Sequence, residues 1–223
     1  MGMAFRTRVA ATALVGLLGW SGQAQFFTPS FQNYQTFAQR SVGYVAATVR
    51  PDFTAKAVQQ ALSPQTTPVK YKYALSRSDF PFKGSPTQQK TCAAMVQKPD
   101  DQRQMATLCL KLFAAAQDIP DFRKNNLASG LALLIGVSLQ VSTGSELTDA
   151  ETDALYRGLN DVLIDAGVMK GKPAEIQAMY ETAVMTGALI AGVAQVGTDD
   201  HNADMTTVAQ TLALVVLKGF GLK

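Results

Sequence analysis

The only histidine of the chain lies in an acidic segment with the residue types of a cation site or a general base. The segment contains Asp199, Asp200, His201, Asn202 and Asp204. Its oxygen atoms could hold a divalent cation weakly, although the glycine and the final glutamate of an EF-hand loop are missing. Carboxylates in a turn also stabilise the N-terminus of the helix that follows. We therefore favour a solvated turn between two helices over a metal site.

A second acidic group could supply the paired carboxylates of acid–base catalysis. It consists of Glu146, Asp149, Glu151 and Asp153. Thr148 and Glu151, however, have the spacing of a capping box, in which two side chains satisfy the first backbone N–H groups of a helix. The capping interpretation is favoured because acids at this place also interact well with the helix dipole.

Lysines alternate with tyrosines over Lys70-Tyr71-Lys72-Tyr73, as on surfaces that bind single-stranded nucleic acid. Two lysines are too few for such a surface. The apolar side chains of 69–75 instead follow the period of two that an extended chain shows. A lone strand leaves its backbone groups unpaired, so we predict an extended arm that docks its tyrosines on a helical body. A small hairpin is the alternative.

Most catalytic and cofactor-binding motifs are missing from the sequence. A single histidine excludes the two-histidine helix motif of zinc proteases and a zinc site of paired cysteines and histidines. The sequence has no G-x-S-x-G, no S-x-x-K, no P-loop and no G-x-G-x-x-G, so the usual serine nucleophiles and phosphate cradles are not encoded. We expect no catalytic residue, no cofactor and no metal, and we favour a protein that is not an enzyme.

The first 24 residues have the three parts of a secretory signal. Arg6 and Arg8 form a short positive region, an apolar stretch covers 9–20, and small residues lie at Gly22 and Ala24. The apolar stretch is shorter than the roughly 20 residues of a membrane-spanning helix. We therefore predict cleavage after Ala24, no membrane anchor after cleavage, and a periplasmic or secreted location.

Composition and charge narrow the class of protein further. Apolar residues make up 47% of the 223 residues and charged residues 17%, enough apolar surface to form a core, so disorder of the whole chain is not expected. Loss of the predicted signal removes two arginines and lowers the basic count from 20 to 18, against 17 acids. A nearly neutral chain lacks the positive charge of a nucleic-acid-binding protein. We therefore expect no nucleic-acid partner, and a protein partner stays possible.

Two cysteines, Cys92 and Cys109, remain in the mature chain. A capping box at 85–88 predicts a helix that ends near residue 98, and a second helix should follow over 100–117. The cysteines would then lie at similar heights on two antiparallel helices. An even pair in an oxidising compartment favours a disulfide between them, with two buried free thiols as the alternative.

Helical periodicity and capping signals dominate the rest of the chain. We predict an all-α fold, a helical bundle of about six helices preceded by a looser N-terminal arm. The predicted parts are a signal peptide (1–24), an N-terminal helix plus extended arm (25–84) and the helical bundle domain (85–223). The arm should hold helices over 31–49 and 53–62.

Four helices of the bundle have clear boundaries in the sequence. Asn125 or Asn126 should cap a buried helix over 127–141, and the box at Thr148 should open a helix that ends at Gly167. Two more helices should start at Pro173 and after Asp200 or Asn202. On the buried helix, small residues at Ala128, Ala132 and Gly136 should let a neighbouring helix approach closely.

Several short stretches from Asn125 onward resemble a known family. They are Asn-Asn-Leu-Ala-Ser-Gly-Leu-Ala-Leu from 125 with its Ser-Thr-Gly end, Leu-Thr-Asp-Ala from 147, Leu-Tyr-Arg-Gly-Leu-Asn from 155, Met-Tyr-Glu-Thr from 179, and a Gly-Phe-Gly tail. The chain is similar in these to an uncharacterised family of secreted bacterial helical proteins, a domain of unknown function. The resemblance implies a signal peptide, an α-helical fold and no established activity, and it brings no catalytic residue.

The sequence favours an exported protein that acts as a non-enzymatic binding or protein-interaction module. The arm 25–84 would be its contact segment, because aromatic side chains of this kind dominate interfaces. These aromatic residues are Phe26, Phe27, Phe31, Tyr34 and Phe37.

Two alternatives remain open at this point. A carboxylate-based hydrolase of the cell envelope would need His201 near an acid from another helix, such as Glu146, Glu181 or Asp161. A carrier of apolar ligands would need a cavity between the helices at 127–142 and 174–196.

Overall fold

The structure, a computed structural model, is described here for residues 39, 43, 51–63, 70–94, 96 and 98–222. The predicted signal peptide and the predicted helix over 31–49 lie outside these residues, apart from positions 39 and 43. The helices of the described part are α3 (Pro51–Leu62), α4 (Gln89–Ala93), α5 (Pro99–Gln117), α6 (Leu127–Thr143), α7 (Asp149–Asp165), α8 (Pro173–Asp199) and α9 (Ala203–Gly219), with short 3-10 helices η3 (Leu75–Ser78) and η4 (Val168–Lys170). The predicted all-α fold is confirmed.

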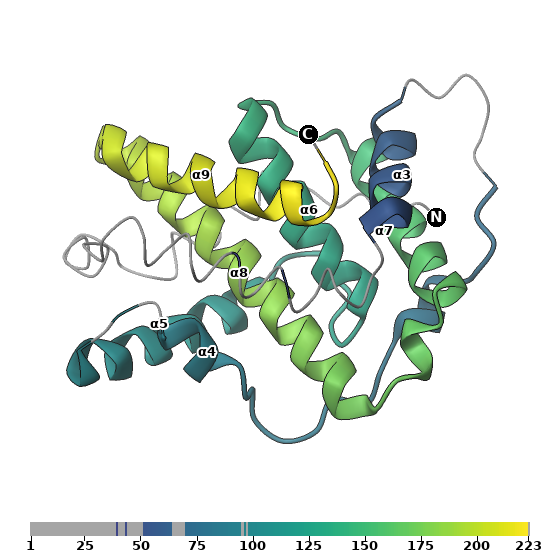
Figure 1. The fold of residues 1–223 in the computed structure, drawn as a ribbon, viewed down its shortest axis with the longest axis horizontal. Helices are drawn as coiled ribbons and strands as arrows, with labels where there is room; N and C mark the ends of the chain where they lie inside the picture. Colours follow the sequence, from purple (N-terminus) through teal and green to yellow (C-terminus); the bar gives the residue numbers. More distant parts are fainter. Residues whose placement is uncertain are drawn as a thin grey trace.

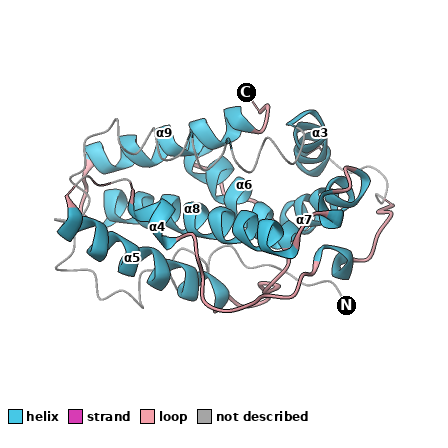
Figure 2. Cartoon of the chain, turned by 60° about the horizontal axis from the view of Figure 1, so that its bottom comes forward, coloured by secondary structure: helices cyan, strands magenta, loops and turns pink. Residues whose placement is uncertain are grey.

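The long helix α8 forms the centre of the bundle (Figure 1). It packs against α6, α9, α5 and α4, and Figure 2 shows α4 and α5 on one side of it with α9 on the other. The helix α7 packs against α6 and α3 at the end of the molecule away from α5. Of the described helices, only α8 is long and apolar enough to cross a membrane, and 94% of its most apolar window is buried inside the fold, as in a core helix.

Glycine allows α6 and α8 to cross at close range. A Cβ atom added at Gly187 would lie 3.1 Å from the Cα atom of Leu134, closer than side chains normally come to a backbone. A Cβ atom at Gly130 would lie 2.8 Å from the ring of Tyr180. The close approach of α8 to α6 therefore depends on these two glycines, whereas Gly136 of the predicted row faces Leu147 and Leu155.

Most predicted helix boundaries are confirmed. Asn126 caps α6 by accepting a hydrogen bond from the backbone N–H of Ser129, and Thr148 forms the predicted capping box with Glu151. Asn202 caps α9 through the N–H groups of its first turn. Each capping side chain follows the residue preference expected for the position.

The predicted capping box at 85–88 is wrong. The helix α4 is short and starts only at Gln89, and its N-cap residue makes no side-chain cap. The carboxylate of Glu181 on α8 instead accepts hydrogen bonds from the backbone N–H groups of Thr87 (2.7 Å) and Gln88 (3.0 Å). A buried charge needs several donors, and the start of α4 supplies them to Glu181, which is 0% exposed.

A neighbouring side chain on α8 holds the segment before α4. The amide of Gln177 accepts a hydrogen bond from the N–H of Lys83 and donates one to its carbonyl, both at 3.0 Å. The same amide nitrogen lies 2.8 Å from the second carboxylate oxygen of Glu181. One face of α8 thus fixes a loop that lies more than ninety residues earlier in the chain.

The two cysteines lie on α4 and α5 at disulfide distance, with the Sγ atoms of Cys92 and Cys109 1.99 Å apart. The pair closes a loop of 17 residues in sequence separation. A cross-link of that length restricts the unfolded chain by about 3 kcal/mol in the chain-entropy model.

Reduction of this disulfide should therefore lower the free energy of unfolding by about 3 kcal/mol. Urea unfolding of the oxidised and reduced protein measures the change, and intact mass confirms the gain of two hydrogens. A Cys92→Ala/Cys109→Ala variant with the stability of the oxidised protein would contradict the expectation.

Residues 70–74 lie along α7 as an arm and lead into η3, and within the described residues they form no hairpin, the alternative to the predicted extended arm. Backbone N–H groups of Lys72 and Tyr73 donate to the carboxylate of Asp161 on α7. The hydroxyl of Tyr73 and the ammonium of Lys72 contact Asp165 one turn later. The lysine–tyrosine pattern therefore docks the arm on α7.

Candidate functional site

A cavity of about 180 Å³ lies between α6 and α7, and we call it the α6–α7 pocket. Its walls are mostly apolar. The α6 residues that line it are Ser129, Ala132, Leu133, Gly136 and Val137, and facing residues include Leu147, Thr152 and Tyr156. Leu75 of η3 contributes to the lining from the arm. Concave apolar sites with few polar groups are the usual form of a small-molecule site.

Small residues on α6 create this space. Ala132 and Gly136 lie one turn apart on the face toward α7, where larger side chains would fill the gap. A Cβ atom at Gly136 would lie 3.6 Å from Leu147 and 3.9 Å from Leu155, which are ordinary contact distances. The row of small residues therefore leaves a pocket open, where the sequence predicted a close helix approach.

Two hydroxyl groups beside the pocket have no hydrogen-bond partner among the described residues. Thr152 and Tyr156 lie four positions apart on α7, so they share one face of the helix. Their hydroxyl oxygens are sealed from solvent and unpaired, which costs about 1–3 kcal/mol for each group. By contrast, the hydroxyls of Ser138 and Thr143 donate to carbonyls one turn earlier in α6.

Burial keeps the phenol of Tyr156 neutral. Desolvation is the largest influence on its pKa and raises it well above the usual value, with smaller effects from Arg123 and Asp79. A neutral phenol can donate one hydrogen bond and accept others. The side chain is thus a candidate hydrogen-bonding partner for a bound molecule.

Two ion pairs border the pocket. The guanidinium of Arg123 binds both carboxylate oxygens of Asp79, at 2.7 and 2.5 Å, and Arg157 binds Asp153 at 2.8 Å. The guanidinium of Arg157 also lies over the ring of Tyr71, 5.8 Å from its centre. The positive charges at the border are therefore compensated by carboxylates.

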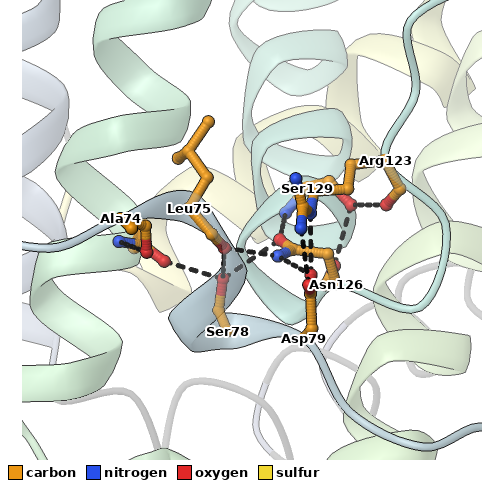
Figure 3. A network of polar contacts seen from close by, with 8 residues as sticks. Ala74, Leu75, Ser78, Asp79, Arg123, Asn126 and Ser129 are labelled. Carbon is orange, nitrogen blue, oxygen red and sulfur yellow. Dashed lines mark hydrogen bonds and ion pairs between the residues drawn. The ribbon is translucent and has the colours of Figure 1, made fainter.

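A buried polar network fixes the arm beside the pocket (Figure 3). The amide nitrogen of Asn126 donates to the carbonyl of Leu75 (2.8 Å) and to Asp79 (2.7 Å). Its amide oxygen lies 3.1 Å from the hydroxyl of Ser78. Burial acts to raise the pKa of Asp79, but hydrogen bonds from Arg123 and Asn126 outweigh it and hold that pKa below its usual value.

The structure does not assemble the histidine-based site of the hydrolase hypothesis. His201 is exposed in the turn between α8 and α9, with a left-handed backbone (φ 50°). Glu181 of α8 is buried, and its carboxylate accepts a hydrogen bond from the backbone at the start of α4. The carboxylate of Asp161 accepts one from the backbone of the arm. Among the described residues, no three His, Cys, Asp or Glu side chains group closely enough to hold a metal ion. Asn202 of the acidic segment caps α9.

A second hollow, of about 320 Å³, lies where α6, α8 and α9 meet. Its lining includes Val141 of α6, Ala194 and Gln195 of α8, and Gln210 of α9. This is the region in which the carrier hypothesis expected a cavity, but the hollow has a more polar lining than the α6–α7 pocket. The more apolar of these two sites therefore lies beside α7, and the sequence did not indicate it.

Comparison with known proteins gives a family but no activity. No curated protein and no solved structure matches the chain. One family model, described as a family of unknown function (DUF6683), matches residues 6–223. This match spans the arm and all of the described helices of the bundle. The chain therefore belongs to the DUF6683 family of unknown function.

Proposed function

We propose that this chain is an exported, non-enzymatic binding protein that holds a small apolar molecule in the α6–α7 pocket. The observation that carries the proposal is the pocket itself, an apolar cavity kept open by Ala132 and Gly136. Larger side chains at these positions would raise the free energy of unfolding, because each empty methyl-sized space lowers it by about 1 kcal/mol. An interface that served stability alone would therefore be filled.

The size of the pocket suits one ring or a short branched chain. Engineered apolar cavities of roughly 150 Å³ bind benzene and stay free of water. The α6–α7 pocket is slightly larger, at about 180 Å³. Export is supported by the signal-like segment 1–24 and by the Cys92–Cys109 disulfide, since disulfides persist in oxidising compartments.

The acid and base residues that the hydrolase hypothesis requires are placed in a way that favours binding over catalysis. Glu181 and Asp161 are engaged by backbone N–H groups, and His201 lies exposed at the far end of α8. General acid–base catalysis needs such groups within reach of a bound substrate. The two arginines of the pocket border instead pair with Asp79 and Asp153.

Filling the pocket should abolish the binding of a small apolar probe. We expect toluene to shift amide resonances of α6 and α7 in ¹H–¹⁵N spectra of the protein, and Ala132→Leu to weaken this binding more than tenfold because the added side chain occupies the pocket. Ala194→Leu makes the same substitution in the second hollow and should leave the titration unchanged. A toluene response that is absent, or that Ala132→Leu does not reduce, would contradict the proposed function.

A further inference from the structure

We infer that the molecule held in the α6–α7 pocket is uncharged and carries one hydrogen-bonding oxygen, as a small phenol, alcohol or carbonyl compound does. This inference rests on the proposed function and specifies its ligand class. It starts from Thr152 and Tyr156, which both line the pocket and both keep a buried hydroxyl without a partner among the described residues.

The unpaired hydroxyl of Thr152 contrasts with the paired hydroxyls of several other helical threonines. Threonines on several other helices donate their hydroxyl to the carbonyl four residues earlier, as Thr107, Thr198 and Thr207 do. Thr152 is 7% exposed and makes no such bond. A rotation about its Cα–Cβ bond re-aims the oxygen without moving α7, so a ligand oxygen can supply the partner that the free protein lacks.

Tyr156 places a second hydroxyl on the same face of α7. Its raised pKa keeps it protonated at neutral pH, so it can donate to an oxygen acceptor or accept from an alcohol. A ligand with one oxygen needs only one of these hydroxyls as its partner, and a side-chain rotation must first turn that hydroxyl toward the pocket, because both oxygens are sealed from solvent. The remaining contacts of the ligand would be with the apolar side chains of α6.

The charges around the pocket argue against an acid as the ligand. Arg123 is held by Asp79 and Arg157 by Asp153, and Asp121 adds a further carboxylate to the lining. A carboxylate ligand would have to compete with an existing ion pair and would meet repulsion from Asp121. A neutral oxygen meets neither obstacle.

Phenol and toluene test this inference because they differ only by a hydroxyl in place of a methyl group. Titration of the full chain, followed by ¹H–¹⁵N spectra, should show that Tyr156→Phe and Thr152→Val each weaken phenol binding about fivefold, the usual effect of one neutral hydrogen bond. Toluene binding should change less than twofold in both variants. Benzoate should not bind measurably to any of them.

Thr186→Val is the matched control. Thr186 also has a buried hydroxyl without a partner among the described residues, but it lies on α8 and lines neither cavity, so its substitution should change the affinity of neither probe. Toluene binding that persists while phenol shows no selective loss in Tyr156→Phe and Thr152→Val would overturn the inference and leave the proposed function standing. Failure of both toluene and phenol to bind would overturn both.

Discussion

Glu181→Ala should lower the free energy of unfolding by about 4 kcal/mol, because it leaves several hydrogen-bond donors without their acceptor and a cavity in place of a buried carboxylate. The carboxylate accepts from the N–H groups of Thr87 and Gln88 and from the amide of Gln177. The side chain itself is fully buried on α8. Chemical denaturation of the purified protein measures the loss.

The control for this variant lies on the same helix. Glu175 is an exposed acid in the first turn of α8, paired only with Lys172 at 3.6 Å. Glu175→Ala should change the free energy of unfolding by about 0.5 kcal/mol or less, as exposed pairs do. Equal effects of the two substitutions would show that the start of α4 does not depend on Glu181.

Asn126→Ala should have an effect of similar size, about 4 kcal/mol. The substitution removes the N-cap of α6, worth about 1 kcal/mol, and also the hydrogen bonds to Leu75, Ser78 and Asp79. Of these partners Ser78 is buried, Leu75 is half-buried and Asp79 is exposed, and three hydrogen bonds at about 1 kcal/mol each add roughly 3 kcal/mol. Hydrogen exchange should also become faster over residues 74–79, where the arm borders the pocket.

Asn202 provides the matched control for this second variant. It caps α9 with the same side-chain geometry, accepting from the N–H groups of Asp204 and Met205, but it is exposed and makes no buried network. Asn202→Ala should therefore cost only about 1 kcal/mol. If both asparagines cost the same, the network around η3 contributes nothing beyond a cap.

Local signals in the sequence were sufficient to predict most of the fold. A cap or box acts on residues three or four positions away, so Asn126, Thr148 and Asn202 could be identified without knowledge of the tertiary structure. The extended arm was predictable for the same reason, from the alternation of side chains within a few residues. The all-α class follows from the sum of these signals.

Long-range contacts explain what the sequence did not indicate. The predicted box at 85–88 had the correct residue types, but Glu181, far along the chain, takes the N–H of Gln88 that the box would have used, together with that of Thr87. The pocket depends on the direction in which Ala132 and Gly136 face α7, which no local pattern encodes. The predicted row of small residues did not indicate a pocket, although Ala132 and Gly136 line one, and the glycines at which α6 and α8 meet most closely lie outside the row.

The location of a bound probe tests the central claim most directly. Intermolecular NOEs between toluene and the methyl groups of the full chain should appear for Leu75, Leu133 and Leu147, which line the α6–α7 pocket and not the second hollow. Ala132→Leu should remove them, and Ala194→Leu should not. NOEs confined to Val141 and Ala191 of the second hollow, or none to any methyl group, would contradict the account of this protein as a binder of small molecules between α6 and α7.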